Sequence, residues 1–130
     1  MSSILIIEDD RDLAELMALT LREAGYETLH APDGRTALDA LEAKRPDLVL
    51  IDVMLPDIVG FSLCENLRRF DATLDLPILM VSACDEIEAL PLARKSGADG
   101  YLQKPFSPHQ LLSRTKALLA AAASARPGGR

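Results

Sequence analysis

Clustered negative charge closes the first apolar run of the chain, "ILIIEDD", which ends in Glu8, Asp9 and Asp10. Carboxylates held close together repel one another, and burying them costs further desolvation free energy. The cluster is therefore either a solvated turn or one wall of a site for a positively charged group. Oxygen ligands of this kind suit a hard divalent cation, and Mg²⁺ typically takes one or two carboxylates and keeps several waters.

Single polar residues close three later apolar runs. Asp52 follows "LVLI", Ser82 follows "ILMV" and Lys104 follows "GYLQ". A carboxylate, a hydroxyl and an ammonium group are together suited to binding a phosphoryl group beside a metal ion. Asp10 is better explained as the N-cap of the helix that follows it, since aspartate is favoured at that position.

These residues can act together only if the chain brings the ends of the apolar runs to one place. Compact apolar runs alternate five times with amphipathic stretches of helical spacing. The predicted strands are residues 3–7, 26–31, 47–53, 77–83 and 99–104, and the predicted helices are 11–25, 33–46, 60–70, 85–97 and 107–123. This alternation predicts an α/β fold with a five-stranded parallel sheet and helices on both faces. Ligands of such sheets bind at the carboxyl ends of the strands, where the acid pair and the three later polar residues would meet.

Local signals set the expected ends of several elements. Ser107 and Pro108 predict the N-cap and first position of the last helix. Pro91 lies inside the helical stretch 85–97 and removes a hydrogen bond there, so that helix is expected to be short or kinked, or to begin only near Leu90. Residues 1–122 are predicted to form one domain, and residues 123–130 a flexible tail or linker.

Composition narrows the class of protein. The 130 residues are 48% hydrophobic and 26% charged, which is typical of one globular domain. The formal net charge of −6 argues against direct nucleic-acid binding by this domain. The sequence shows no signal peptide, membrane span or disulfide framework, so a cytoplasmic location is predicted. His30 and His109 are isolated from each other and are interpreted as surface residues.

Four motifs in register resemble the receiver domain of bacterial two-component response regulators, from Ile4 to about Leu119. They are "EDD" after the first strand, "DVMLPDIVG" after the third, "SA" after the fourth and "KPF" after the fifth. The resemblance implies a flavodoxin-like fold with the strand order 2-1-3-4-5. One departure is Val59, which stands where the family usually has a polar or acidic residue before the loop glycine.

The resemblance also implies a phosphoacceptor and a metal site. Asp52 matches the aspartate that the family phosphorylates. Glu8 and Asp9 match the acid pair that binds Mg²⁺ together with that aspartate, and Met54 matches the residue whose backbone carbonyl completes the metal site.

Further residues match the phosphoryl contacts and the conformational switch of the family. Ser82 and Lys104 stand where a hydroxyl and a lysine contact the phosphoryl group. Ser82 and Tyr101 match the pair that switches conformation, and the bond between Lys104 and Pro105 is expected to be cis.

The expected function is therefore that of a phosphoacceptor signalling domain and not of an enzyme with a separate substrate. The phosphoryl donor would be a sensor histidine kinase or a histidine phosphotransfer protein. The altered surface would comprise the fourth helix, fifth strand and fifth helix, and it would signal to a downstream effector protein or domain. Two phosphorylated copies are expected to be able to pair as a homodimer, and no membrane is expected among the partners.

Two other classes of function remain open from the sequence. One is a hydrolase or phosphotransferase with an aspartate nucleophile, of the haloacid dehalogenase type. Such enzymes have the motif DxD at the nucleophile, whereas Met54 occupies the second acidic position here. They also need a cap domain over the substrate, for which this chain has no spare residues. A receiver-like interaction module that works without phosphorylation is the other alternative. The intact acid pair, Ser82 and Lys104 argue against it.

Overall fold

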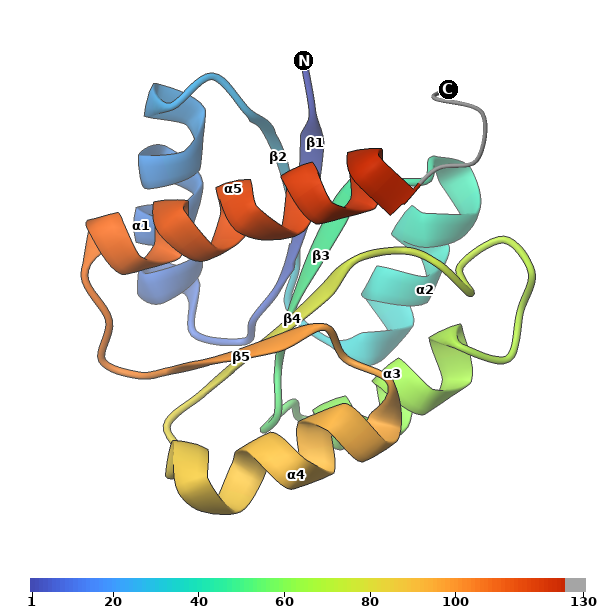
Figure 1. Cartoon of the computed structure of the whole chain (residues 1–130). Helices are drawn as coiled ribbons and strands as arrows, with labels where there is room; N and C mark the ends of the chain where they lie inside the picture. Colours follow the sequence, from blue (N-terminus) through green and yellow to red (C-terminus); the bar gives the residue numbers. More distant parts are fainter. Residues whose placement is uncertain (126–130) are drawn as a thin grey trace.

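The computed structural model describes residues 1–125, which form five parallel strands and five helices (Figure 1). The strands are β1 (Ser3–Ile7), β2 (Glu27–Ala31), β3 (Leu48–Asp52), β4 (Ile78–Ser82) and β5 (Gly100–Gln103). The helices are α1 (Arg11–Glu23), α2 (Gly34–Ala43), α3 (Gly60–Leu67), α4 (Glu86–Ser96) and α5 (Pro108–Ala125). The sheet has the order β2-β1-β3-β4-β5, which confirms the predicted fold class and flavodoxin-like order.

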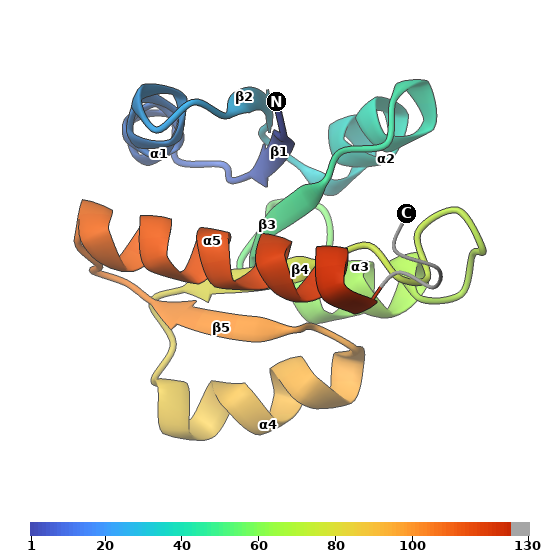
Figure 2. The ribbon, with the colours of Figure 1, turned by 45° about the horizontal axis from the view of Figure 1, so that its top comes forward.

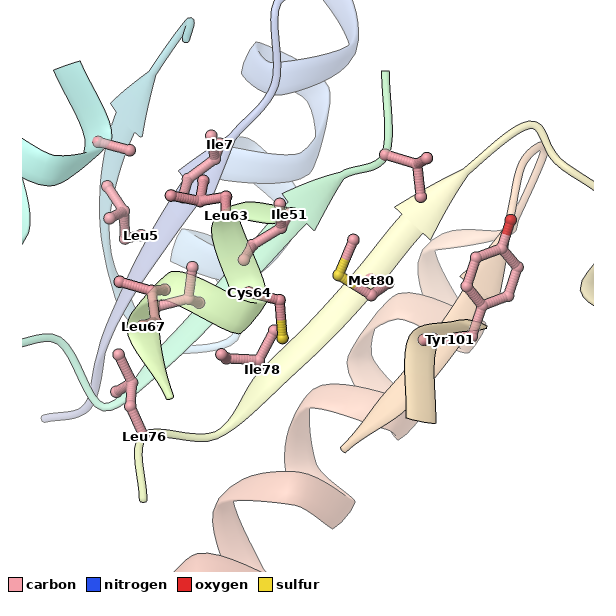
Figure 3. Close-up of a cluster of buried hydrophobic side chains, with 14 of the residues drawn as sticks. Leu5, Ile7, Ile51, Leu63, Cys64, Leu67, Leu76, Ile78, Met80 and Tyr101 are labelled. Atoms are coloured by element: carbon pink, nitrogen blue, oxygen red, sulfur yellow. The ribbon is translucent and has the colours of Figure 1, made fainter. Parts of the chain in front are cut away.

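Helices cover both faces of the sheet (Figures 1 and 2). One apolar cluster joins one face to α2, α3 and α4, and a second cluster joins the opposite face to α1 and α5. Every residue of β1, β3 and β4 is buried, as expected for strands covered on both sides. Figure 3 shows the first cluster, in which Cys64 and Met80 lie among aliphatic side chains and Tyr101 lies on β5.

Side-chain caps begin two helices where the sequence predicts them. The Asp10 carboxylate accepts a hydrogen bond from the Leu13 N–H at 3.2 Å, at the start of α1. The Ser107 hydroxyl accepts one from the Gln110 N–H at 3.1 Å, and α5 begins at Pro108. That helix continues to Ala125, and the rest of the predicted tail lies outside the described residues.

Helix α4 does not begin near Leu90, which was one of the expectations for this segment. Its N-cap is Asp85, whose carboxylate accepts a hydrogen bond from the Ile87 N–H at 2.8 Å, and the helix passes through Pro91. Proline at this position removes the bond that would reach the Ile87 carbonyl four residues earlier. Ile87 is 86% exposed, so water can reach this part of the helix and limits the cost. None of the helices within residues 1–125 combines the length and apolar character that a membrane span requires.

The end of the loop between β3 and α3 packs against the backbone at the start of the same loop. Val59 is the N-cap residue of α3 and makes no side-chain capping bond, which is where the sequence departs from the family pattern. Backbone contacts take over: the Gly60 N–H donates to the Val53 carbonyl at 2.7 Å, and Met54 forms an isolated bridge with Val59. The loop that follows Asp52 is thus held by main-chain pairing.

A second contact fastens this loop to α2. The Asp57 carboxylate accepts hydrogen bonds from the first two N–H groups of α2, at 2.8 Å from Gly34 and 3.0 Å from Arg35. These bonds lower the pKa of Asp57, because they favour the charged carboxylate. The acid of "LPDIVG" therefore serves as a cap for a helix distant in sequence.

Candidate functional site

The carboxyl ends of four strands bring the polar residues together at one edge of the sheet. Glu8 directly follows β1, Asp52 and Ser82 are the last residues of β3 and β4, and Lys104 directly follows β5. Glu8 is 2% exposed, Asp52 5% and Ser82 1%. Parallel pairing of β1 with β3, β3 with β4 and β4 with β5 makes this convergence a consequence of the strand order.

Lys104 forms the centre of the charged contacts. Its Nζ lies 2.8 Å from Glu8 Oε1 and 3.0 Å from Asp52 Oδ2. The other Asp52 oxygen, Oδ1, accepts a hydrogen bond from the Met54 N–H at 3.0 Å. One lysine therefore bridges two nearly buried carboxylates, and the loop after β3 orients the second of them.

The three predicted acids form a cluster with the spacing of a cation site. Glu8, Asp9 and Asp52 each offer a carboxylate oxygen within 4.8 Å of the others. Two of these residues are buried and Asp9 is exposed, so the cluster opens to solvent on the Asp9 side. Hard oxygen donors in such a set fit a divalent cation, and Mg²⁺ retains waters that an open side would accommodate.

Burial and the neighbouring charged groups shift the pKa values of Glu8 and Lys104. Burial raises the pKa of Glu8 to about 7, the Asp52 carboxylate also raises it, and hydrogen bonds from Lys104 and from the Asp10 N–H oppose the rise. Burial by itself would lower the pKa of Lys104, but the bonds to Glu8 and Asp52 outweigh it and raise that pKa. The lysine stays charged and compensates only part of the clustered negative charge.

Ser82, Cys84 and Tyr101 form a connected group beside the acids. The Ser82 hydroxyl lies 3.5 Å from the Cys84 Sγ and 3.4 Å from the Cys84 backbone nitrogen. Tyr101 is 1% exposed, and its hydroxyl donates to the Cys84 carbonyl at 2.6 Å. The aromatic side chain is therefore directed inward and is tied to the loop after β4. The Lys104–Pro105 bond is cis, as the resemblance predicts.

One contact at this edge was missed from the sequence. His30 is exposed, as predicted, but its Nε2 also lies 2.7 Å from the Glu8 carbonyl oxygen, a contact that the sequence did not indicate. The local signal was Pro32, two residues later. Proline ends the backbone pairing of β2, so the Glu8 carbonyl on the neighbouring segment is left for a side chain to bond.

Removing one acid from the cluster is expected to stabilise the metal-free protein. Asp52→Asn relieves repulsion with Glu8 and Asp9, while Lys104 keeps its 2.8 Å partner. In chelator we expect the unfolding free energy to rise by about 1 kcal/mol, or the melting temperature by about 4 °C, and stabilisation by added Mg²⁺ to shrink. Thermal melts with and without Mg²⁺ measure both effects.

Asp71→Asn is the matched control, because it removes the same charge from an exposed loop position. It should change neither melt by more than a degree or so. A variant at Asp52 that melts lower than wild type in chelator would show that repulsion does not dominate the cluster.

The fold and the site define a flavodoxin-like α/β domain with clustered acids and a lysine at the carboxyl edge of its sheet. The model of the response regulator receiver domain family matches residues 4–116, and the chain belongs to this family. Receiver domains are signalling domains of two-component systems.

Individual relatives agree with this assignment. The chain is 41% identical over 119 residues to the DNA-binding dual master transcriptional regulator RpaA of Synechocystis sp., covering 92% of this chain and 49% of that protein. It is 40% identical over 117 residues to the phosphate regulon transcriptional regulatory protein PhoB of Pseudomonas aeruginosa, covering 90% and 51%. The crystal structure of the signal receiver domain of a signal transduction histidine kinase from Syntrophus aciditrophicus matches with a TM-score of 0.88 at 31% identity, covering 98% of this chain and 96% of that one. The chain spans about half the length of the curated relatives it matches.

Proposed function

We propose that this chain is a phosphoacceptor domain that takes a phosphoryl group on Asp52 in a Mg²⁺-dependent reaction. The observation that carries the proposal is the contact of Lys104 with both Asp52 and Glu8, beside a cluster of three carboxylates. In other surroundings, so many charges at one nearly buried edge would be unfavourable. In a site for a metal ion and a phosphoryl group, the carboxylates would bind the cation and Lys104 would bind a phosphoryl oxygen.

Asp52 acts as the nucleophile in this scheme. Its Oδ attacks the phosphorus of a phosphohistidine donor, the phosphorus–nitrogen bond breaks, and the bonding electrons leave with the imidazole, which takes up a proton. Lys104 contributes a point charge to a phosphoryl oxygen and Ser82 a hydroxyl donor to another. Fixed charges of this kind stabilise the transferring group with little reorganisation.

Mg²⁺ would be held by Glu8, Asp9, Asp52 and the backbone carbonyl of Met54. When bound, the ion supplies positive charge that neutralises phosphoryl oxygens facing the carboxylates. The residues of this chain bring the three carboxylates together without the ion, since one oxygen of each lies within 4.8 Å of the others.

Ser82 and Tyr101 are proposed as the switch. Recruitment of the Ser82 hydroxyl to an acyl phosphate would break its contacts with Cys84, to which Tyr101 is also bonded. A change in this loop reaches α4, which begins directly after it, and β5, whose Tyr101 hydroxyl donates to the Cys84 carbonyl. The α4-β5-α5 surface is therefore proposed to change between two packings.

The partners follow from the same chemistry. The donor is a sensor histidine kinase or a histidine phosphotransfer protein, and the receiver of the signal is a downstream effector protein or domain. We propose a cytoplasmic location, no direct nucleic-acid binding by this domain, and a homodimer that forms on phosphorylation. The domain would also assist its own phosphorylation and dephosphorylation.

The lifetime of the phosphorylated form is expected to depend on Met54. This side chain is 67% exposed and lies two residues after the acceptor, and its thioether is a weak hydrogen-bond acceptor that orients water poorly. Met54→Asn should hydrolyse its acyl phosphate several-fold faster than wild type, by an effect of about 1 kcal/mol. Decay of the phosphorylated mass after removal of the donor gives the rate.

Met54→Leu is the control for this comparison, since it keeps an apolar side chain of similar size. It should decay at the wild-type rate. Equal decay rates of the asparagine variant and wild type would show that the Met54 side chain does not control the lifetime of the phosphorylated form.

Intact mass after incubation with acetyl phosphate tests the proposed function. Wild type should gain one phosphoryl group in the presence of Mg²⁺ and none in chelator, and Asp52→Asn should gain none. Beryllofluoride mimics the acyl phosphate but does not hydrolyse in the same way, so its binding would reveal a competent acceptor whose phosphoryl adduct is lost too quickly to detect. Absence of both adducts in a protein that binds Mg²⁺ would favour the interaction module that works without phosphorylation.

A further inference from the structure

His30 makes a side-chain contact to the main chain of the acidic segment. Its Nε2 lies 2.7 Å from the Glu8 carbonyl oxygen. A carbonyl oxygen only accepts hydrogen bonds, so Nε2 must carry the hydrogen and donate it. His30 is an exposed residue near the carboxyl end of β2, and Glu8 is the first residue after β1, so the contact joins the ends of two neighbouring strands.

The sheet explains why a side chain is needed at this place. The Glu8 N–H donates to the Ala31 carbonyl at 3.0 Å, which extends the β1–β2 ladder one residue beyond β1. In a regular parallel ladder, the Glu8 carbonyl would next accept from the N–H of Asp33. β2 ends at Ala31, and from Pro32 onward the chain leaves the sheet and turns into α2, whose N-cap is Asp33. The imidazole of His30 thus replaces a missing backbone donor.

We propose that His30 is a positioning residue for the cation site, a role that rests on the proposed Mg²⁺ binding. The Glu8 carbonyl belongs to the peptide unit that joins Glu8 to Asp9, so fixing this oxygen fixes the orientation of the unit. On the other side, the Asp10 N–H donates to Glu8 Oε2 at 3.1 Å. The two acids of the pair are held by contacts on both sides of the peptide that connects them.

Asp9 gains most from this restraint. Glu8 is nearly buried and has Lys104 as a partner, whereas Asp9 is exposed. An exposed ligand on a short turn loses conformational freedom when a metal binds, which weakens binding unless the backbone is already ordered. His30 orders that backbone without touching the metal itself, in the manner of groups that orient metal ligands from behind.

The test measures Mg²⁺ affinity by isothermal titration calorimetry for wild type, His30→Ala and His30→Gln. Glutamine places an amide N–H at a similar reach and cannot titrate, so it should restore the bond. We expect about tenfold weaker binding for the alanine variant and recovery to within about twofold for glutamine. Far-UV circular dichroism and thermal melts in chelator establish that each variant is folded.

Thr28→Ala is the matched control, since Thr28 also lies on β2 and its hydroxyl accepts a hydrogen bond from Arg22 at 3.3 Å, away from the acids. Wild-type affinity in this control, together with loss and rescue at position 30, supports the positioning role. Wild-type affinity in His30→Ala overturns it, and so does an equal loss in the control or a failure of glutamine to rescue. Absence of Mg²⁺ binding in wild type would instead overturn the proposed metal site, and the role of His30 with it.

Discussion

Gly60→Ala is expected to destabilise the protein by about 2 kcal/mol, although alanine is the better helix former. A Cβ at Gly60 would lie 2.8 Å from the Cα of Val53 and still closer to the Asp52 carbonyl oxygen. These neighbours are backbone atoms of β3 and its continuation, and they cannot rotate away. Alanine gains at most about 1 kcal/mol of helix propensity, whereas overpacking against rigid backbone costs about 1–3 kcal/mol or more.

The same substitution should disturb the site, because the displaced backbone carries Asp52. We expect lower stabilisation by Mg²⁺ in addition to a lower denaturation midpoint in urea. Gly100→Ala is the control: its Cβ would meet the Leu79 Cδ1 at 3.2 Å, the end of a side chain that can move. Similar losses in both variants would show that close approach at Gly60 is not the cause.

Arg68→Met is expected to lower the free energy of unfolding by about 3 kcal/mol. The Arg68 guanidinium donates from Nη1 and Nε to four backbone carbonyls. They belong to Thr73 at 3.0 Å, Leu74 at 3.1 Å, Leu76 at 2.7 Å and Gly97 at 2.8 Å. Its Nη2 lies 3.0 Å from an oxygen of Asp99. The side chain is 17% exposed, so several acceptors lose a charged donor in a place that water reaches poorly.

The loss follows from what Arg68 joins. The four carbonyls belong to the segment between α3 and β4 and to the end of α4, and Asp99 also accepts from the first N–H of β4 at 2.8 Å. Lysine keeps the charge but lacks the planar fork, so Arg68→Lys should recover less than half of the lost stability. Arg69→Met removes the same charge from an exposed neighbour and should change the urea midpoint little. A small loss for Arg68→Met would mean that water replaces the guanidinium at these carbonyls.

Much of the fold was predictable because burial leaves a clear pattern in the sequence. β1, β3 and β4 are covered on both faces, so they read as continuous apolar runs and their polar ends locate the site. The N-caps Asp10 and Ser107 were predicted because both residue types are favoured at that position, and each bonds a backbone N–H only three residues ahead. The strand order and the roles at the site came from the resemblance to a family.

Contacts between distant residues were not predictable in the same way. His30 reaches a carbonyl 22 residues away, and Arg68 reaches residues 29 and 31 positions away. Such contacts depend on how an edge strand or a helix end packs, which no local pattern encodes. The start of α4 was uncertain for a different reason. Pro91 leaves the Ile87 carbonyl without its helical donor, and the cost of this depends on whether water can reach that carbonyl, which the sequence does not show.

The most direct test of phosphorylation at Asp52 is to locate the acyl phosphate along the chain. Wild type is incubated with acetyl phosphate and Mg²⁺ and reduced with borohydride, which converts an aspartyl phosphate to homoserine. Mass spectrometry of the peptides then identifies the modified residue. We expect homoserine at Asp52 alone, dependent on Mg²⁺. Modification at another carboxylate, or none at Asp52 in a protein whose intact mass shows the adduct, would contradict the account.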